Sequence, residues 1–342
     1  MLRIVGIISC AVWLIVGAGL EGPNPAQAQK KMIDITFSLD FITLGRHAPW
    51  YVTLEKGFYK AEGLNVKIIQ GKGTAQVMQA VESGVAEIGF VDVASLVIGR
   101  SRGSTIKMVA VNYQKAPYTI FSLDPGANVT KPKDLEGLTV GSSAGSFLPE
   151  LHKALMKKHG LDPSKLRIVN IAPPARVAAL ATGKVPAVDF YIMSRPLIEG
   201  AVRGKAKVRA FLLADHGLEL YSNGIGAKQD YIKKNPEIIR KFVRASLRGW
   251  KYAMDHPAEA ADMQRKHKKA LKRAVIIKEL AIVKDLSLTP DTKKHGYGWF
   301  SPAKIKTAVD LMVTHAKIDK AKAPRPEDMY VSGFLPKKPI MP

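Results

Sequence analysis

Apolar and polar positions follow two alternating rhythms along this chain. Residues 33–37 alternate as a half-buried β-strand does, with β-branched side chains at Ile33 and Ile35. Residues 50–61 then repeat their apolar side chains at helical spacing and end before Gly63. The same succession predicts strands over residues 66–69, 87–91 and 106–111, and helices over residues 74–83 and 94–100. Strands that alternate with helices are typical of a mostly parallel α/β sheet.

The rhythm begins again after a turn-rich stretch at residues 124–128. The second unit is predicted to contain strands over residues 138–141, 167–171, 187–191 and 208–213, and helices over residues 147–159 and 176–182. Residues 234–256 have the pattern of one long amphipathic helix, and the pattern stays almost entirely helical after them. Strand-like residues 118–123 and 219–227 flank the second unit, so we expect the chain to leave the first unit and return to it there.

These patterns predict two α/β lobes. Residues 29–120 together with residues 225–342 would form lobe I, and residues 121–224 would form lobe II. With 342 residues and 46% hydrophobic composition, the chain is long enough for more than one domain. A cleft between two such lobes is a natural ligand site.

The first 28 residues have the pattern of a secretory signal peptide. Arg3 precedes an apolar run over residues 4–20, and Ala26-Gln27-Ala28 has the form of an A-x-A cleavage site. A membrane anchor is the alternative, but the run is short for a membrane span and a cleavage site follows it. We therefore expect export to the periplasm and cleavage after Ala28. Cys10 is the only cysteine, so the mature chain would contain no disulfide and no cysteine nucleophile.

The chain carries a net charge of +23, from 52 basic and 29 acidic residues. A charge of this size is compatible with nucleic-acid binding, and also with attraction of an anionic solute or of a charged envelope surface. The basic residues are dispersed over the whole chain and form no nucleic-acid-binding motif, so we expect no nucleic-acid partner. His152, His159 and His216 do not have metal-ligand spacing, and we find no Ser-His-Asp arrangement, so neither a metal site nor a catalytic site is predicted.

Three loops each follow a predicted strand and precede a predicted helix: residues 71–74, 90–95 and 141–146. In α/β sheets ligands bind beyond the carboxyl ends of the strands. Free N–H groups at a helix N-terminus suit a carboxylate, sulfonate or phosphate, and glycine lets the backbone approach the ligand closely. Each loop alone is also compatible with an ordinary capped turn, but three loops at the same place in the pattern favour an anion-binding site.

Three segments near the start of the mature chain, residues 35–41, 47–49 and 56–64, resemble the opening of solute-binding proteins of the thiamine-pyrimidine and sulfonate/nitrate/taurine type. Gly57-Phe58-Tyr59 followed by Glu62-Gly63-Leu64 is the most specific part of this resemblance. Further similar segments are residues 84–89, 135–137, 140–141, 179–188, 235–242 and 329–336. The resemblance covers nearly all of the mature chain. It is specific for the superfamily and poor for the substrate.

The resemblance implies a type II periplasmic-binding-protein fold, in which two α/β lobes with a hinge close on a solute in the interlobe cleft. It implies a monomer without a cofactor that delivers a small-molecule solute to the membrane permease and ATPase of an ABC importer. A sensory or chemotaxis binder would share the same physics. Carried over by position, the ligand-binding residues are Asp40, Phe41, Arg46, His47, Gly73, Thr74, Asp92, Ser95, Tyr113, Ser143, Gly145, Ser146, Phe147, Asp189 and Tyr191.

Several of these residues also fit a structural role. Asp40 is suited to accept a hydrogen bond from a ligand or to cap a turn, and His47 and Asp92 are open to the same two interpretations. Tyr113 and Tyr191 are suited to line an aromatic slot, although aromatic side chains after strands are commonly part of the core.

In the resemblance, the pyrimidine-binding members have motifs similar to LDW and NHAP. This chain has Leu39-Asp40-Phe41 and Arg46-His47-Ala48-Pro49 at the matching positions. Phe41 keeps a flat ring, whereas Arg46 in place of asparagine disfavours a pyrimidine. We therefore expect a small solute with a flat or apolar part and an anionic group, such as a sulfonate, a taurine-like compound or a thiamine-pyrimidine precursor.

The family also contains an enzyme, thiamine pyrimidine synthase, which consumes one of its own histidines, binds pyridoxal phosphate on a lysine and carries a cysteine cluster for iron. The position that matches the histidine is Ser95 here, and the position that matches the lysine is Val91. The resemblance therefore favours a binding protein that is not an enzyme, and leaves a synthase-like enzyme as the alternative.

Overall fold

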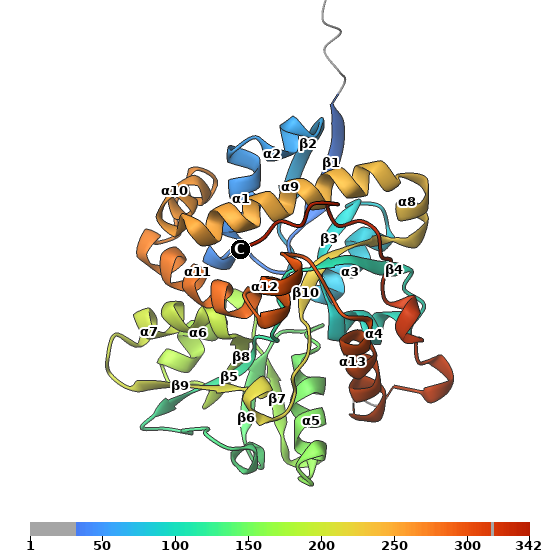
Figure 1. Cartoon of the computed structure of the whole chain (residues 1–342). Helices are drawn as coiled ribbons and strands as arrows, with labels where there is room; N and C mark the ends of the chain where they lie inside the picture. Colours follow the sequence, from blue (N-terminus) through green and yellow to red (C-terminus); the bar gives the residue numbers. More distant parts are fainter. Residues whose placement is uncertain (1–31, 316–317) are drawn as a thin grey trace, which may run out of the picture. The chain divides into compact units, whose positions relative to one another are not determined.

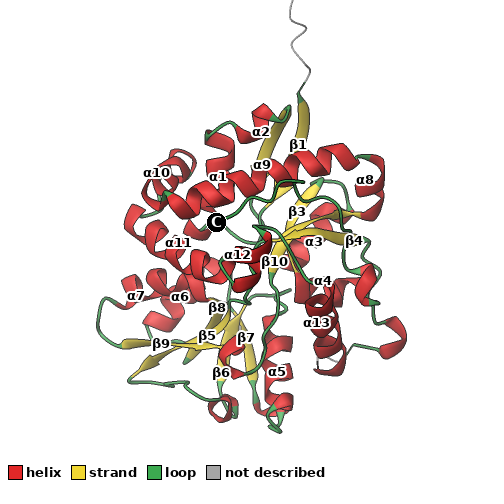
Figure 2. Ribbon diagram, viewed as in Figure 1, coloured by secondary structure: helices red, strands yellow, loops and turns green. Residues whose placement is uncertain are grey.

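The computed structural model describes residues 32–315 and 318–342, so the predicted signal peptide and its cleavage site lie outside the described residues. The described chain forms two five-stranded sheets, with strand order β2-β1-β3-β10-β4 in the first and β7-β6-β8-β5-β9 in the second (Figure 2). The first sheet contains β1 (Ile33–Ser38), β2 (Leu64–Ile69), β3 (Ile88–Asp92), β4 (Ile106–Val111) and β10 (Asn223–Lys228). The second contains β5 (Tyr118–Asp124), β6 (Thr139–Ser142), β7 (Arg167–Asn170), β8 (Ala187–Tyr191) and β9 (Lys207–Leu212).

Helices pack against both sheets (Figure 1). The helices that precede residue 125 are α1 (Ala48–Glu55), α2 (Phe58–Ala61), α3 (Thr74–Glu82) and α4 (Val93–Arg100). The next three helices alternate along the chain with the strands of the second sheet: α5 (Leu148–Lys158), α6 (Pro173–Ala181) and α7 (Arg195–Val202). The helical end of the chain contains α8 (Gln229–Lys234), α9 (Pro236–Asp255), α10 (Pro257–His267), α11 (Arg273–Ser287), α12 (Pro290–His295) and α13 (Pro302–His315). None of the helices in the described chain combines the length and hydrophobicity needed to cross a membrane.

The two sheets share one topology. In each, four strands point the same way and the fifth is antiparallel to both of its neighbours: β10 lies between β3 and β4, and β5 lies between β8 and β9. The expectation of a mostly parallel arrangement therefore needs a correction, because half of the neighbouring pairs in each sheet are antiparallel. The two antiparallel strands come from the segments that flank the second unit in the sequence, at residues 118–123 and 219–227. The division of the chain into two lobes stays a prediction.

Two predicted helices are interrupted in the structure. The helix expected over residues 50–61 breaks into α1 and α2 at Gly57, whose φ of 68° is left-handed and costs little only for glycine. The helix expected over residues 234–256 starts only at Pro236, because proline lacks the N–H that would continue α8.

Aromatic rings fill the core between the first sheet and its helices. The Trp50 ring of α1 lies 4.5 Å from the Phe37 ring of β1 and 5.1 Å from the Trp250 ring of α9, measured between centroids. Phe90 of β3 lies 5.0 Å from Trp50 in an edge-to-face arrangement, which adds a favourable ring geometry to the burial of apolar area. This cluster fixes α1, and with it the loop that precedes α1, against the carboxyl end of β1.

We predict that Gly249→Ala lowers the free energy of unfolding by about 1–3 kcal/mol, the usual cost of overpacking a core. A Cβ at Gly249 of α9 would lie 1.9 Å from Oγ1 of Thr53 in α1, so the two helices would have to separate. Gly200→Ala is the matched control, because Gly200 is an exposed position of α7 where a Cβ would meet no atom within 4 Å. Urea denaturation should show Gly200→Ala neutral or stabilised, and equal destabilisation of both variants would contradict the prediction.

Candidate ligand-binding site

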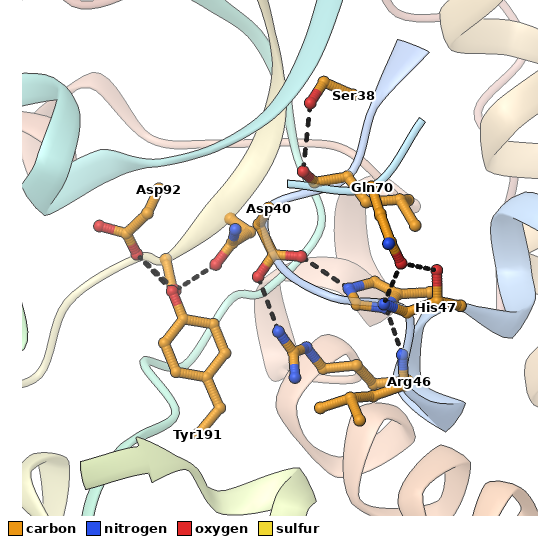
Figure 3. A network of polar contacts seen from close by, with 12 residues as sticks. Ser38, Asp40, Arg46, His47, Gln70, Asp92 and Tyr191 are labelled. Carbon is orange, nitrogen blue, oxygen red and sulfur yellow. Dashed lines mark hydrogen bonds and ion pairs between the residues drawn. The ribbon is translucent and has the colours of Figure 1, made fainter. Parts of the chain in front are cut away.

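The loop between β1 and α1 is organised around a buried carboxylate. Asp40 is 3% exposed, and its Oδ2 accepts a hydrogen bond from Nη2 of Arg46 at 2.9 Å. Its Oδ1 lies 2.7 Å from Nε2 of His47 (Figure 3). Because Nδ1 of His47 accepts the N–H of Leu44 at 3.0 Å, the proton of the neutral ring belongs on Nε2, which donates to Asp40. Burial raises the pKa of Asp40, but Arg46 and His47 outweigh it and lower that pKa to about 2.

Helix α11 packs against the same loop at residues 45 and 46. The buried Glu279 accepts the backbone N–H of Arg46 at 2.8 Å. The two segments touch so closely at Gly45 that a Cβ there would lie 2.7 Å from the Cα of Ile276. Burial raises the pKa of Glu279 to about 7, although Arg46 and the backbone N–H groups oppose this rise. The position of Arg46 therefore depends on a carboxyl group that titrates near neutral pH.

A second buried arginine approaches from α6. Arg176 is 2% exposed, and its Nη1 donates to the backbone carbonyl of Asp189 at 2.6 Å and also to the Asp189 carboxylate. The guanidinium carbon of Arg176 lies 4.2 Å from the Phe190 ring centroid and 5.6 Å from that of Phe41. Arg46 approaches the Phe41 ring as well, at 5.5 Å. Phe41 therefore lies beside two guanidinium groups, one from the loop after β1 and one from α6.

Phe41 and Leu44 join the apolar cluster of the second sheet, although both precede α1. They are buried with Leu180, Val188, Phe190 and their neighbours. This contact ties the loop after β1 to α6 and β8.

A small cavity opens where these groups meet. Its free volume is about 40 Å³, enough for a few water molecules. Thr74 begins α3, Leu148 begins α5, and both helix starts contribute to the wall, so backbone N–H groups and the positive ends of two helices are near the cavity. The lining residues are Asp40, Phe41, Arg46, Gly73, Thr74, Ser143, Ser146, Phe147, Leu148, Arg176, Phe190 and Tyr191.

Asp92 belongs to a hydrogen-bond network that links the cavity residue Tyr191 to the two antiparallel strands, β5 and β10. Its Oδ2 accepts the hydroxyl of Tyr118, at the start of β5, at 2.6 Å, and the hydroxyl of Ser222, just before β10, at 2.7 Å. Tyr191 at the end of β8 reaches the same oxygen at 3.5 Å (Figure 3). Oδ1 of Asp92 accepts the N–H of Ser95 at 2.9 Å. Burial raises the pKa of Asp92. One carboxyl group therefore connects the ends of β3 and β8 with both antiparallel strands.

A family model described as NMT1/THI5 like matches residues 45–260. The chain belongs to the NMT1/THI5-like family. This confirms the resemblance predicted from the sequence. Its similarity to the riboflavin-binding protein RibY of Chloroflexus aurantiacus is 31% identity over 252 residues, which cover 72% of this chain and 69% of that protein.

Other relatives differ in function. The formylaminopyrimidine-binding protein of Halalkalibacterium halodurans is 22% identical over 70% of this chain and 72% of that protein. The 4-amino-5-hydroxymethyl-2-methylpyrimidine phosphate synthase of Candida albicans is 24% identical over 66% of this chain and 69% of that protein. The family relatives of this chain thus include both solute-binding proteins and synthases.

The comparison with solved structures concerns the fold. The alkanesulfonate-binding protein SsuA of Xanthomonas axonopodis pv. citri, bound to MOPS, superposes with a TM-score of 0.69 over 89% of this chain and 99% of that one, at 16% sequence identity. SsuA of Escherichia coli gives a TM-score of 0.65 at 15% identity, over 87% and 97% of the two chains. The periplasmic-binding-protein fold that the sequence predicted is confirmed.

Nine of the fifteen residues that the sequence predicted as ligand-binding line the cavity, and their contact with a ligand stays a prediction. The other six lie outside the lining. His47, Asp92 and Asp189 hold Asp40, Tyr191 and Arg176, respectively, through the contacts described above. These three side chains support the cavity wall.

The last three predicted residues, Ser95, Tyr113 and Gly145, also lie outside the cavity lining. Ser95 is buried in the first turn of α4, and Tyr113 packs edge-to-face on Trp250 with centroids 5.8 Å apart. Gly145 turns the loop before α5 with a left-handed φ of 75°.

Leu148, Arg176 and Phe190 also line the cavity, although they were not among the ligand-binding residues predicted from the sequence. Arg176 had a signal of its own, because it is the only charged residue between Asn170 and Lys184. A single charge in an otherwise apolar helix indicates a buried partner or a ligand.

We predict that Glu279 makes the free energy of unfolding depend on pH. The unfolded carboxyl has a pKa near the ordinary 4.5, whereas the folded one has a pKa of about 7. Between these values the folded protein keeps a proton that the unfolded chain loses, so the stability contributed by Glu279 falls as the pH rises and is constant above about pH 7. Relative to Glu279→Gln, the wild type should lose about 3 kcal/mol of unfolding free energy between pH 4.5 and 7.5.

Denaturant titrations at pH 4.5, 6 and 7.5 measure this difference. Glu199→Gln is the control, because Glu199 is an exposed residue of α7 that pairs with Arg195 at the surface. A difference between wild type and Glu279→Gln that does not change with pH would refute the prediction.

Proposed function

We propose that this protein is the extracytoplasmic solute-binding component of an ABC importer, and that it performs no chemistry on its solute. The solute is a small organic molecule with a flat part and an anionic group. After cleavage at Ala28 the protein acts in the periplasm as a monomer and delivers the solute to a membrane permease and its ATPase. Residues 29–120 and 225–342 form one lobe in this proposal, and residues 121–224 form the other.

The observation that carries the proposal is the cavity at the junction of the two sheets. Its wall combines aromatic rings, two buried arginines and the starts of two helices, which together suit a flat anion. The solute-binding relatives support a binding role: RibY is named for riboflavin, and a second relative is named for formylaminopyrimidine.

The alternative is a synthase-like enzyme, which the synthase relatives keep in view. Two positions argue against it. Val91, which matches the cofactor-binding lysine in the resemblance, is fully buried in β3. Ser95, which matches the consumed histidine, is buried at the start of α4 and does not line the cavity. Neither side chain can form a Schiff base or replace an imidazole.

A thermal-shift screen on the mature protein, starting at Gln29, tests the proposal. A solute that binds only the folded state stabilises it by about 2.7 kcal/mol at a concentration 100 times its Kd. We expect at least one compound among sulfonates, aromatic acids, pyrimidines and flavins to raise the melting temperature. Formation of a pyrimidine product from the purified protein with pyridoxal phosphate and iron would contradict the proposal.

We further predict that Phe41→Ala weakens binding of the solute found in the screen by about 1–3 kcal/mol, the scale of one lost aromatic contact. Phe334→Ala serves as the control, because Phe334 is similarly buried but lies outside the cavity lining. Calorimetry should show lower affinity only for Phe41→Ala. Unchanged affinity in this variant would remove Phe41 from the site.

A further inference from the structure

Arg46 and Arg176, the two arginines that line the cavity, have guanidinium N–H groups without a hydrogen-bond partner among the described residues. A guanidinium has five N–H donors. Arg46 gives one nitrogen to Asp40, and Arg176 gives one nitrogen to Asp189. The Nε atoms of both arginines are buried and have no hydrogen-bond partner among the described residues. Burying such donors unpaired is costly. Both arginine side chains line the cavity, so a ligand there would reach the guanidinium N–H groups that Asp40 and Asp189 leave unused.

The carboxylates prepare each arginine for this task. Asp40 stays ionised, so Arg46 keeps a counterion and a fixed direction inside the protein. Asp189 pairs with Arg176, whose guanidinium also lies over the Phe190 ring at 4.2 Å. A fixed guanidinium fork recognises a planar oxyanion better than a mobile ammonium does.

The aromatic side chains of the cavity wall favour an aromatic group on the ligand beside its oxyanion. Aromatic rings at Phe41, Phe147, Phe190 and Tyr191 line the same cavity. The two carboxylates neutralise the two arginines, so the extra negative charge of a ligand has to be offset by the starts of α3 and α5, whose first residues are in the wall.

We propose that Arg46 and Arg176 clamp one acidic group of the solute between them, and that the solute is therefore an aromatic carboxylate or sulfonate. This inference rests on the proposed solute-binding function and narrows its ligand class. Arg46 comes from the loop after β1 and Arg176 from α6, so the acidic group bridges the two walls of the cavity. Arg176 becomes a specificity-determining residue that the sequence analysis did not identify.

The test compares acids with uncharged analogues of the same shape. Benzoate, terephthalate and benzenesulfonate are titrated by calorimetry beside their amides, with riboflavin and a methylaminopyrimidine as neutral references. We expect at least one acid to bind and its amide to bind about 10- to 100-fold more weakly, the scale of losing hydrogen bonds to a charged group.

Variants assign this preference to the clamp. Arg176→Gln alone leaves the buried Asp189 beside only His152, whose Nε2 lies 3.5 Å from its Oδ2. The double variant Arg176→Gln/Asp189→Asn therefore serves as the second test, because it removes both members of the pair. In both, we expect the affinity for the acid to fall about 10- to 100-fold while the affinity for its amide stays the same. Arg176→Lys should recover only part of the loss, and Arg195→Gln, at an exposed residue of α7 outside the cavity lining, should bind as the wild type does.

The outcomes separate this inference from the proposed function. If riboflavin or the pyrimidine binds and no acid does, the arginine clamp is wrong and the solute-binding function stands. If the double variant keeps the wild-type preference for the acid over its amide, the clamp is wrong as well. If no compound in either set binds, the result counts against both.

Discussion

The ionised carboxylate of Asp40 is the constraint on which the rest of the site depends. A buried carboxylate at the end of β1 is tolerated only because Arg46 and His47 face it, and removal of one partner from such a pair typically costs about 3–5 kcal/mol. The same contacts fold residues 40–47 into a compact loop. That loop delivers Phe41 and Leu44 to the apolar cluster of the second sheet and Arg46 to the cavity.

The second wall repeats this arrangement with other elements. Asp189, the third of the five residues of β8, holds Arg176 as Asp40, two residues after the end of β1, holds Arg46. Asp92 then connects this region to both antiparallel strands, so the segments that pass between the sheets are joined to the cavity wall by hydrogen bonds.

The order of strands and helices, and the loops that line the cavity, could be predicted because hydrophobic periodicity and strand-to-helix turns are local features of the sequence. The long-range contacts of the residues in these loops could not be predicted. The contact between Glu279 and the N–H of Arg46 joins residues 233 positions apart, and no local pattern indicates it. For the same reason His47 was predicted as a ligand contact, although in the structure its ring supports Asp40. Arg176 was not predicted, because one arginine in a helix is usually a surface residue. Its isolation among apolar residues was the local signal, and that signal does not reveal its buried partner Asp189.

The Phe41 ring and a bound oxyanion would interact with the same two cavity arginines. In the structure, the guanidinium groups of Arg46 and Arg176 both lie against the Phe41 ring. In the proposed complex, the oxyanion would compete with this ring for the same two guanidinium groups. The affinity is then the difference between two sets of contacts to the same guanidinium groups, those with the ring and those with the oxyanion. An oxyanion gains charge-assisted hydrogen bonds in this exchange, whereas a neutral ring gains only another ring contact, so the exchange itself discriminates in favour of acids.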